Sequence, residues 1–502
     1  MRGMATRFCE PGVVRVRPVV AAALAALSLL ASCADTRSAS GDPEGAVREP
    51  RLKLTAERSD PFLDELQART FAFFWDLANP TNGLVPDRWP DGVLPDFCSI
   101  AAVGFGLTAY PIGVQRGFIT REEARDRVLA TLRFFANAPQ GPEPTGKAGH
   151  KGFFYHFINM KTGARYAQDV ELSSIDTSLL LAGVLACQTY FDSADPGEAE
   201  IRTLADALYR AADWGFLQPR PPLVSMGWTP EHGLHNLDWR GYDEAMILYV
   251  LALGSPTHPV SPQAWAEYTS TYVWAPWYGQ EYVAFSPLFG HQFTQVWVDC
   301  RGIRDDYMRG KGIDYFENTR RAVYAQRAYA TANPMGWVGY GEDIWGVTAC
   351  DGPADVTLPV NGTPRRFYTY AGRGVGATFV LDDGTIAPMG AASSIPFAPE
   401  IAIPAVKAMR ERYGEYLYST YGFFDAFNPT FTFDVTPGMG RIVPGVGWFG
   451  TDYLGLDQGP IVAMIENYRT GFVWSLMRKN PYIVNGLRRA GFTGGWLAGS
   501  PE

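Results

Sequence analysis

The sequence reads Trp239-Arg-Gly-Tyr-Asp-Glu-Ala-Met-Ile-Leu-Tyr-Val-Leu-Ala-Leu253 where two adjacent carboxylates, Asp243 and Glu244, precede an unbroken apolar run. A helix with charge only at its front is buried on nearly all sides. Unpaired backbone N–H groups favour negative charge there, so we expect both carboxylates in the first turn of this helix. In a structural interpretation, Asp243 caps the helix and Glu244 interacts favourably with the positive end of the helix dipole. A chemical role gains weight because the same arrangement recurs twice.

The first recurrence lies between residues 170 and 183, where Glu171 precedes an apolar run and Asp176 is expected in its first helical turn. Ser173 and Asp176 also have the spacing of a capping pair, so a structural role for Asp176 stays open.

The second recurrence is the stretch Gly455-Leu-Asp-Gln-Gly-Pro460. Proline is favoured in the first turn of a helix, so Asp457 is expected just ahead of a helix, in a Gly-rich loop. Gly459 then occupies the cap position, which makes capping by Asp457 the weaker interpretation. The candidate catalytic residues are therefore Asp176, Glu244 and Asp457.

Loops that mix indole rings with carboxylates are typical of sugar-binding sites. Pyranose faces stack on aromatic rings, while sugar hydroxyls need acidic acceptors. Residues 336–351 and the neighbourhood of Asp457 have this composition. The candidate substrate-binding residues are Glu171, Asp243, Trp337, Glu342, Asp343, Trp345, Asp351, Trp448 and Tyr453.

Apolar and amphipathic helices alternate along the chain. Buried helices are expected near 99–117, 173–191, 241–253 and 461–477, with amphipathic helices between them, such as the one begun by the capping-box pattern Thr120 to Glu123. Two concentric rings of helices produce this alternation. A solenoid would also do so, but no repeat of fixed length is present. Residues 365–387 alternate like strands, with a hairpin turn expected at 382–384. We predict an all-α fold with long loops and a small β excursion.

Composition excludes several kinds of function. The 502 residues carry a net charge of −9 and no basic patch, which argues against nucleic acid as a partner. The cysteines match no zinc pattern, and His232 and His235 have the wrong spacing for a zinc helix, so no metal or cofactor is expected. A disulfide between Cys300 and Cys350 is chemically allowed in an oxidising compartment.

The N-terminus indicates secretion. Residues 1–33 combine a basic leader with a short apolar run that ends in Leu30-Ala-Ser-Cys33, which resembles a bacterial lipobox. An ordinary signal peptide is the alternative. Residues 34–59 are polar and are expected to form a flexible tether. Because Ala34 and not Asp follows the cysteine, we expect a periplasm-facing protein lipidated at Cys33, on the outer membrane in preference to the inner one.

Four strings resemble the bacterial glycoamylase-like family, which includes endo-β-1,2-glucanases. They are Glu171-Leu-Ser-Ser-Ile-Asp-Thr, Tyr242-Asp-Glu-Ala, Trp345-Gly-Val-Thr-Ala and Asp457-Gln-Gly-Pro. The resemblance implies an (α/α)6 barrel over residues 60–495 that hydrolyses glycosides with inversion. It also implies that Glu244 and Asp457 are the essential carboxylates, supported by Asp176 and Glu171. The substrate that it suggests is β-1,2-glucan.

We therefore expect a monomeric hydrolase of a neutral glucan. Glu244 is assigned as general acid and Asp457 as general base, ionised in a wet loop, with their carboxyl groups roughly 6.5–9.5 Å apart to admit a water. The alternatives are a non-catalytic glycan-binding lipoprotein and a polysaccharide lyase. Acidic loops argue against a lyase, because a uronate substrate needs a cationic or neutralising site.

Overall fold

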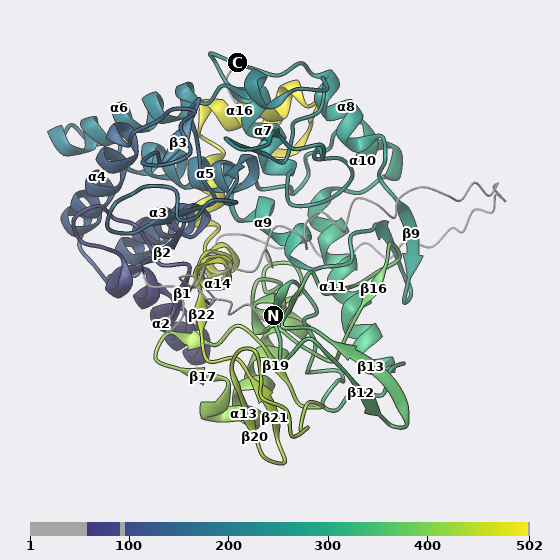
Figure 1. The fold of residues 1–502 in the computed structure, drawn as a ribbon. Coiled ribbons are helices and arrows are strands. Elements are labelled where there is room, and N and C mark those ends of the chain that lie inside the picture. The colour runs from purple at the N-terminus through teal and green to yellow at the C-terminus, as the bar shows by residue number, and fades with distance from the viewer. Residues whose placement is uncertain (1–57, 91–95, 500–502) are drawn as a thin grey trace, which may run out of the picture.

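The computed structural model describes residues 58–90 and 96–499, which include the predicted catalytic domain apart from residues 91–95. The predicted signal peptide, Cys33 and nearly all of the tether lie outside the described residues. The fold is largely helical, and its strands are short (Figure 1). Within the described ranges, no helix is both long and apolar enough to cross a membrane.

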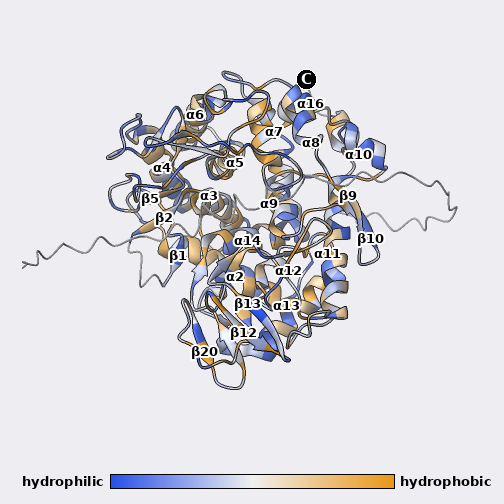
Figure 2. Ribbon diagram, turned by 45° about the vertical axis from the view of Figure 1, so that its right-hand side comes forward, coloured by the Kyte–Doolittle hydropathy of each residue, from blue (hydrophilic) through white to orange (hydrophobic). Residues whose placement is uncertain are grey.

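Among the described residues, six helices have more than four-fifths of their residues buried. In α7 all nine residues are buried, and this helix is largely orange in Figure 2, whereas α10 and α16 at the periphery show blue. The six are α3 (Ile100–Gln115), α5 (Ser174–Tyr190), α7 (Met246–Gly254), α9 (Phe289–Trp297), α12 (Pro388–Ala392) and α14 (Gly455–Arg469).

These buried helices contact one another in a closed cycle. Helix α3 packs against α5, α5 against α7, α12 against α14, and α14 against α3. Two hydrogen bonds complete the cycle. Ile247 N in α7 donates to Thr294 Oγ1 in α9 over 3.0 Å, and Gln292 Nε2 in α9 donates to Gly390 O in α12 over 2.8 Å. Segments that are far apart in the sequence therefore surround a common centre.

Other helices pack on the outside of this cycle. Helix α2 covers α3 and α14, α4 covers α3, α6 covers α5, α11 covers α9, α13 covers α12, and α16 covers α7. Their bounds, and those of the three remaining α-helices, are α2 (Pro61–Leu77), α4 (Arg121–Asn137), α6 (Pro196–Ala211), α8 (Gln263–Thr269), α10 (Asp306–Lys311), α11 (Tyr315–Ala332), α13 (Pro399–Tyr413), α15 (Phe472–Met477) and α16 (Pro481–Arg489).

Short strands pair within the loops, in sheets of two or three. The antiparallel pair of β1 and β22 joins an early segment of the chain to the start of α14. The strands are β1 (Arg88–Trp89), β2 (Phe97–Ser99), β3 (Gly149–His150), β4 (Phe153–Phe154), β5 (Phe157–Asn159), β6 (Leu172–Ser173), β7 (Gly227–Thr229), β8 (Gly233–Leu234), β9 (Trp274–Trp277), β10 (Gln280–Val283), β11 (Cys350–Asp351), β12 (Val356–Val360), β13 (Thr363–Phe367), β14 (Tyr370–Ala371), β15 (Gly374–Val375), β16 (Val380–Leu381), β17 (Tyr418–Ser419), β18 (Gly422–Phe423), β19 (Phe427–Asn428), β20 (Arg441–Val443), β21 (Gly447–Phe449) and β22 (Tyr453–Leu454).

Two helix starts differ from the sequence prediction. Helix α7 begins at Met246, because Asp243 Oδ1 accepts a hydrogen bond from Ala245 N and holds the chain in a turn first. Asp243 and Glu244 therefore precede the helix and are not in its first turn. Helix α14 begins at Gly455, so Asp457 lies inside its first turn and not in a loop ahead of it.

Helix α14 also ends earlier than predicted. It stops at Arg469, and Gly471, with a φ of +69°, separates it from α15. A left-handed backbone at this position breaks the continuous helix that was expected over residues 461–477.

The β excursion is present, but its turn lies elsewhere. Strands β12 and β13 form a hairpin around Asn361 and Gly362, whose φ angles of +49° and +76° suit a tight turn. At 382–384 no hairpin forms, because Asp382 Oδ1 accepts from Gly384 N and the chain continues into α12. Cys300 and Cys350 are both buried free thiols, so the disulfide that the sequence allowed is absent from the described residues.

Candidate active site

The turn before α7 presents two buried carboxyl groups. Glu244 is 4% exposed, and Asp243 Oδ1 accepts a hydrogen bond from the Tyr268 hydroxyl over 2.9 Å. Burial raises the pKa of Asp243 to about 7. Burial, then the charges of Asp243 and Asp176, raise the pKa of Glu244 well above its ordinary value. These shifts favour the protonated form of Glu244, which is the form that a general acid needs.

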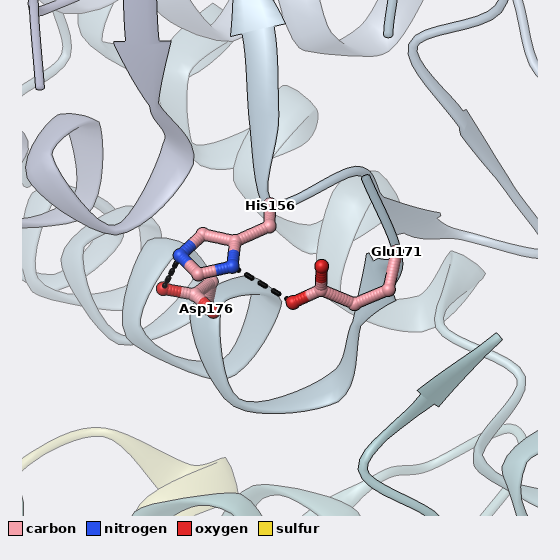
Figure 3. Close-up of side chains that lie close together, drawn as sticks. All are labelled: His156, Glu171 and Asp176. Carbon is pink, nitrogen blue, oxygen red and sulfur yellow. Dashed lines mark hydrogen bonds and ion pairs between the residues drawn. The ribbon is translucent and has the colours of Figure 1, made fainter. Parts of the chain in front are cut away.

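The start of α5 presents a second set of groups. Ser173 caps this helix, because its Oγ accepts from Asp176 N over 3.1 Å and donates to Asp176 Oδ2 over 2.5 Å. The capping interpretation of Asp176 is thus confirmed, and the carboxylate has a further partner. The imidazole of His156 lies between Asp176 and Glu171, which precedes β6, as Figure 3 shows.

This trio has the residue types of a metal site, but its geometry does not suit one ion. Candidate ligand atoms of His156, Glu171 and Asp176 lie within 4.8 Å of one another. However, Glu171 faces Nδ1 of the ring and Asp176 faces Nε2, on opposite sides (Figure 3). An ion bound at one ring nitrogen would leave the other carboxylate across the ring. The three side chains form an internal ion-pair network.

The start of α14 presents a carboxyl pair. Asp457 is 5% exposed and Asp425, in the loop between β18 and β19, is 2% exposed. The side chains of Asp457 and Asp425 are close enough to hydrogen-bond to each other, which requires a proton on one of them. Burial and the neighbouring acids raise the pKa of both groups, of Asp457 the more strongly. The wet loop expected around Asp457 is not present, because this residue is buried in the first turn of α14, and its raised pKa opposes the expected ionisation.

A guanidinium group lies beside this pair. Arg88 Nη1 bonds Asp351 Oδ2 at 2.9 Å and Asp452 Oδ2 at 3.3 Å, and Arg88 Nε contacts Asp87 Oδ2 at 3.4 Å. The backbone N–H of Asp351 donates to Asp425 Oδ2 over 2.7 Å. The Arg88 cation thus offsets the charges of the carboxylates around it. The backbone N–H of Asp351 helps to orient the pair of Asp425 and Asp457.

The groups at the starts of α5, α7 and α14 belong to one site. Asp176 raises the pKa of Glu244 by its charge. The charge of Asp87 raises the pKa of His156. The same Asp87 contacts Arg88, which lies beside the carboxyl pair. The start of α14 is tied to the same place, because Gly455 N donates to Asp87 O over 2.8 Å. The structure therefore brings Asp176, Glu244 and Asp457 into one acidic neighbourhood.

The three tryptophans that were expected to stack on the sugar are buried. Trp337, Trp345 and Trp448 are at most 2% exposed. Trp337 Nε1 donates to Asp382 Oδ2, and Trp448 Nε1 donates to the carbonyl of Met439. These rings belong to the core and offer no open face, because packing and hydrogen bonds enclose them.

The other predicted binding residues are distributed between the core and the surface. Tyr453 is buried in β22, directly opposite Trp89 in β1. Glu342 and Asp343 are exposed, and Glu342 pairs with Arg327 at 3.4 Å. Substrate binding by these three residues stays a prediction.

Sequence reasoning missed several members of the acidic neighbourhood. They come from loops and strand ends without a helix-start pattern, so no local signal marked them. Arg88 had one cue, the adjacent Trp89, which is 45% exposed where most tryptophans are buried. The missed residues are Asp87, Arg88, His156, Asp425 and Asp452.

Comparison with known proteins yields consistent matches. A family model described as "Glycoamylase: Putative glucoamylase" matches residues 236–481. A solved structure of the same description, from Bacteroides uniformis, is 32% identical with a TM-score of 0.74, and the match covers 89% of this chain and 100% of that one. An endo-β-1,2-glucanase structure from Chitinophaga pinensis is 27% identical with a TM-score of 0.73, over 87% of this chain and 99% of that one.

A curated relative is similar at comparable identity. The exo β-1,2-glucooligosaccharide sophorohydrolase of Parabacteroides distasonis is 30% identical over 86% of this chain. The chain spans 58% of the length of that relative.

Proposed function

Because the chain belongs to the glycoamylase family, we propose that it is a glycoside hydrolase that cleaves β-1,2-linked glucan. Two relatives named for β-1,2-glucan cleavage support this substrate. The observation that carries the proposal is the placement of one buried acid, Glu244, in the same neighbourhood as a separate buried carboxyl pair, Asp425 and Asp457.

The proposed reaction uses each group once. Glu244 donates its proton to the glycosidic oxygen as the bond from that oxygen to the anomeric carbon breaks. A water attacks the anomeric carbon from the opposite face and loses a proton to the carboxyl pair. Asp425 has the lower pKa of the pair, so it is the member that ionises first and takes the proton from the water, and Asp457 orients it. The products are a reducing sugar and a leaving sugar with a new hydroxyl group.

We further propose inversion of configuration and an (α/α)6 barrel as the scaffold. A water must fit between acid and base, so the carboxyl groups of Glu244 and of the pair are expected roughly 6.5–9.5 Å apart. The closed cycle of six buried helices, each covered by an outer helix, supports the barrel. Attachment through a lipidated Cys33, facing the periplasm, is proposed from the lipobox-like sequence.

Incubation of the purified protein with linear β-1,2-glucan, and with β-1,3- and β-1,4-glucans as controls, tests the proposal. We expect short β-1,2-linked products from the first substrate only. Sophorose alone would indicate exo action, and a ladder of lengths would indicate endo action. NMR of the first product should show the α-anomer. A β-anomer would refute inversion, and no cleavage of any β-1,2-glucan would refute the assigned substrate.

A further inference from the structure

The imidazole of His156 is enclosed between two carboxylates. The residue is 5% exposed, Nδ1 lies 2.7 Å from Glu171 Oε1, and Nε2 lies 3.4 Å from Asp176 Oδ1 (Figure 3). The ring also stacks on Phe157, with centroids 3.8 Å apart and planes at 16°. Packing and both ion pairs thus fix the orientation of the ring.

This arrangement favours the charged form of the ring. Neutral imidazole has one N–H and can donate to one carboxylate, whereas imidazolium donates to both. Burial disfavours the charge, but Asp176, Glu171 and Asp87 together raise the pKa of His156 to about 9. His235 faces Glu171 from the other side, and burial lowers its pKa, so it is the weaker cation. His156 is therefore the charged group of this network at neutral pH.

The network leads to the proposed general acid. Asp176 is held by Ser173 Oγ at one oxygen and by His156 at the other. Burial raises the pKa of Asp176, and the His156 cation opposes that rise. The negative charge on Asp176 acts on Glu244, together with that of Asp243. The charge state of His156 therefore affects the pKa of Glu244 through the charge on Asp176.

We propose that His156 is a positioning residue for the general acid: it holds Asp176 oriented and ionised beside Glu244, so that Glu244 keeps the proton needed for catalysis. This inference rests on the proposed function. It assigns His156 a role in setting the protonation of Glu244 without contact with the substrate.

The pH dependence of kcat/KM tests this role. In His156→Gln the side chain keeps an N–H donor but loses the charge, so Asp176 takes up a proton and no longer repels the anion of Glu244. The basic limb of the kcat/KM profile should then move to lower pH by about one unit. Asp176→Asn should give the same shift, and the double variant no further shift. His258→Gln, which removes a half-exposed ring, is the matched control and should leave the limb in place.

Two kinetic results would overturn the inference. If His156→Gln lowers kcat/KM while its basic limb stays in place, the residue has only a structural role. A limb displaced to higher pH would mean that Asp176 remains ionised without the cation.

A second measurement does not depend on activity. The His156 ring in 15N-histidine-labelled protein, identified by the signal missing in His156→Gln, should show both nitrogens protonated at pH 7. The same ring should titrate at lower pH in Asp176→Asn. A neutral ring at pH 7 refutes the inference even if the protein cleaves glucan. A charged ring in a protein that cleaves no glucan refutes the proposed function and leaves the ion-pair network standing.

Discussion

Replacement of Glu244 by Gln should abolish most activity while leaving the fold intact. Glu244 is 4% exposed, its raised pKa favours the protonated form, and Gln has nearly the shape of a protonated carboxyl group, so packing is conserved. Gln cannot donate a proton to the leaving oxygen. We expect kcat/KM on β-1,2-glucan to fall by about 10²–10⁴, equivalent to about 3–5 kcal/mol of transition-state stabilisation.

The same replacement should change how stability depends on pH. Above pH 4.5, the ordinary pKa, the unfolded chain releases the Glu244 proton while the folded protein retains it. Folding then binds one extra proton, so this residue lowers the free energy of unfolding by about 1.4 kcal/mol per pH unit, up to the folded pKa. In Glu244→Gln the side chain does not titrate, so this fall in the free energy of unfolding with pH is absent. Relative to wild type, Glu244→Gln should gain at most about 3 kcal/mol between pH 4.5 and pH 7.

Urea denaturation at pH 4.5 and pH 7, followed by tryptophan fluorescence, measures this gain, and reducing-end release measures kcat/KM. Glu122→Gln is the matched control, because Glu122 is exposed in the first turn of α4. The control should change neither quantity. Retention of more than a tenth of wild-type activity in Glu244→Gln would refute its role as acid. A stability difference that does not grow with pH would refute its raised pKa.

Three further predictions concern other parts of the chain. Asp425→Asn and Asp457→Asn should each lower kcat/KM by about 10²–10⁴, and the double variant should lose little more, because the two groups act as one proton-sharing pair; additive losses would contradict this. Arg373→Met should lower the free energy of unfolding by about 3–5 kcal/mol, because it leaves the fully buried carboxylate of Asp383 without its cation; unchanged urea denaturation would contradict this. Cys33→Ser should move the protein from the membrane fraction to the soluble fraction of cells, and a wild type that is already soluble would contradict lipidation.

Local patterns predicted most helices correctly, and failed where one residue type has two uses. The capping box of Thr120 and Glu123 is present and begins α4. The buried helix expected near 99–117 is α3, Ile100–Gln115. Pro460 was taken as a helix start, yet it lies inside α14, whose first turn is built from Gly455 onward. Proline fits both the first turn and, at some cost, a later position, so composition alone does not distinguish the two.

The candidate site was predictable only where it coincides with helix starts. Glu244 and Asp457 were found because each stands beside an apolar run. His156 and Asp425 lie in loops, and their importance comes from neighbours distant in the chain. The same reason applies to the ionisation expected for Asp457, because the partner that opposes it, Asp425, is supplied by tertiary structure.

Helix α14 is held by segments from the opposite part of the chain. Gln67 Nε2 and Arg116 Nε donate to Glu466 Oε2 over 2.9 and 2.6 Å, and Asn467 Nδ2 donates to Val296 O over 2.9 Å. Contacts of such high sequence separation form slowly, because loop-closure entropy opposes them until both partners are present. The faces of α2 and α3 that pack on α14 can be covered only after residue 469 has been synthesised. Until then the nascent chain exposes those faces, which makes it a substrate for chaperones.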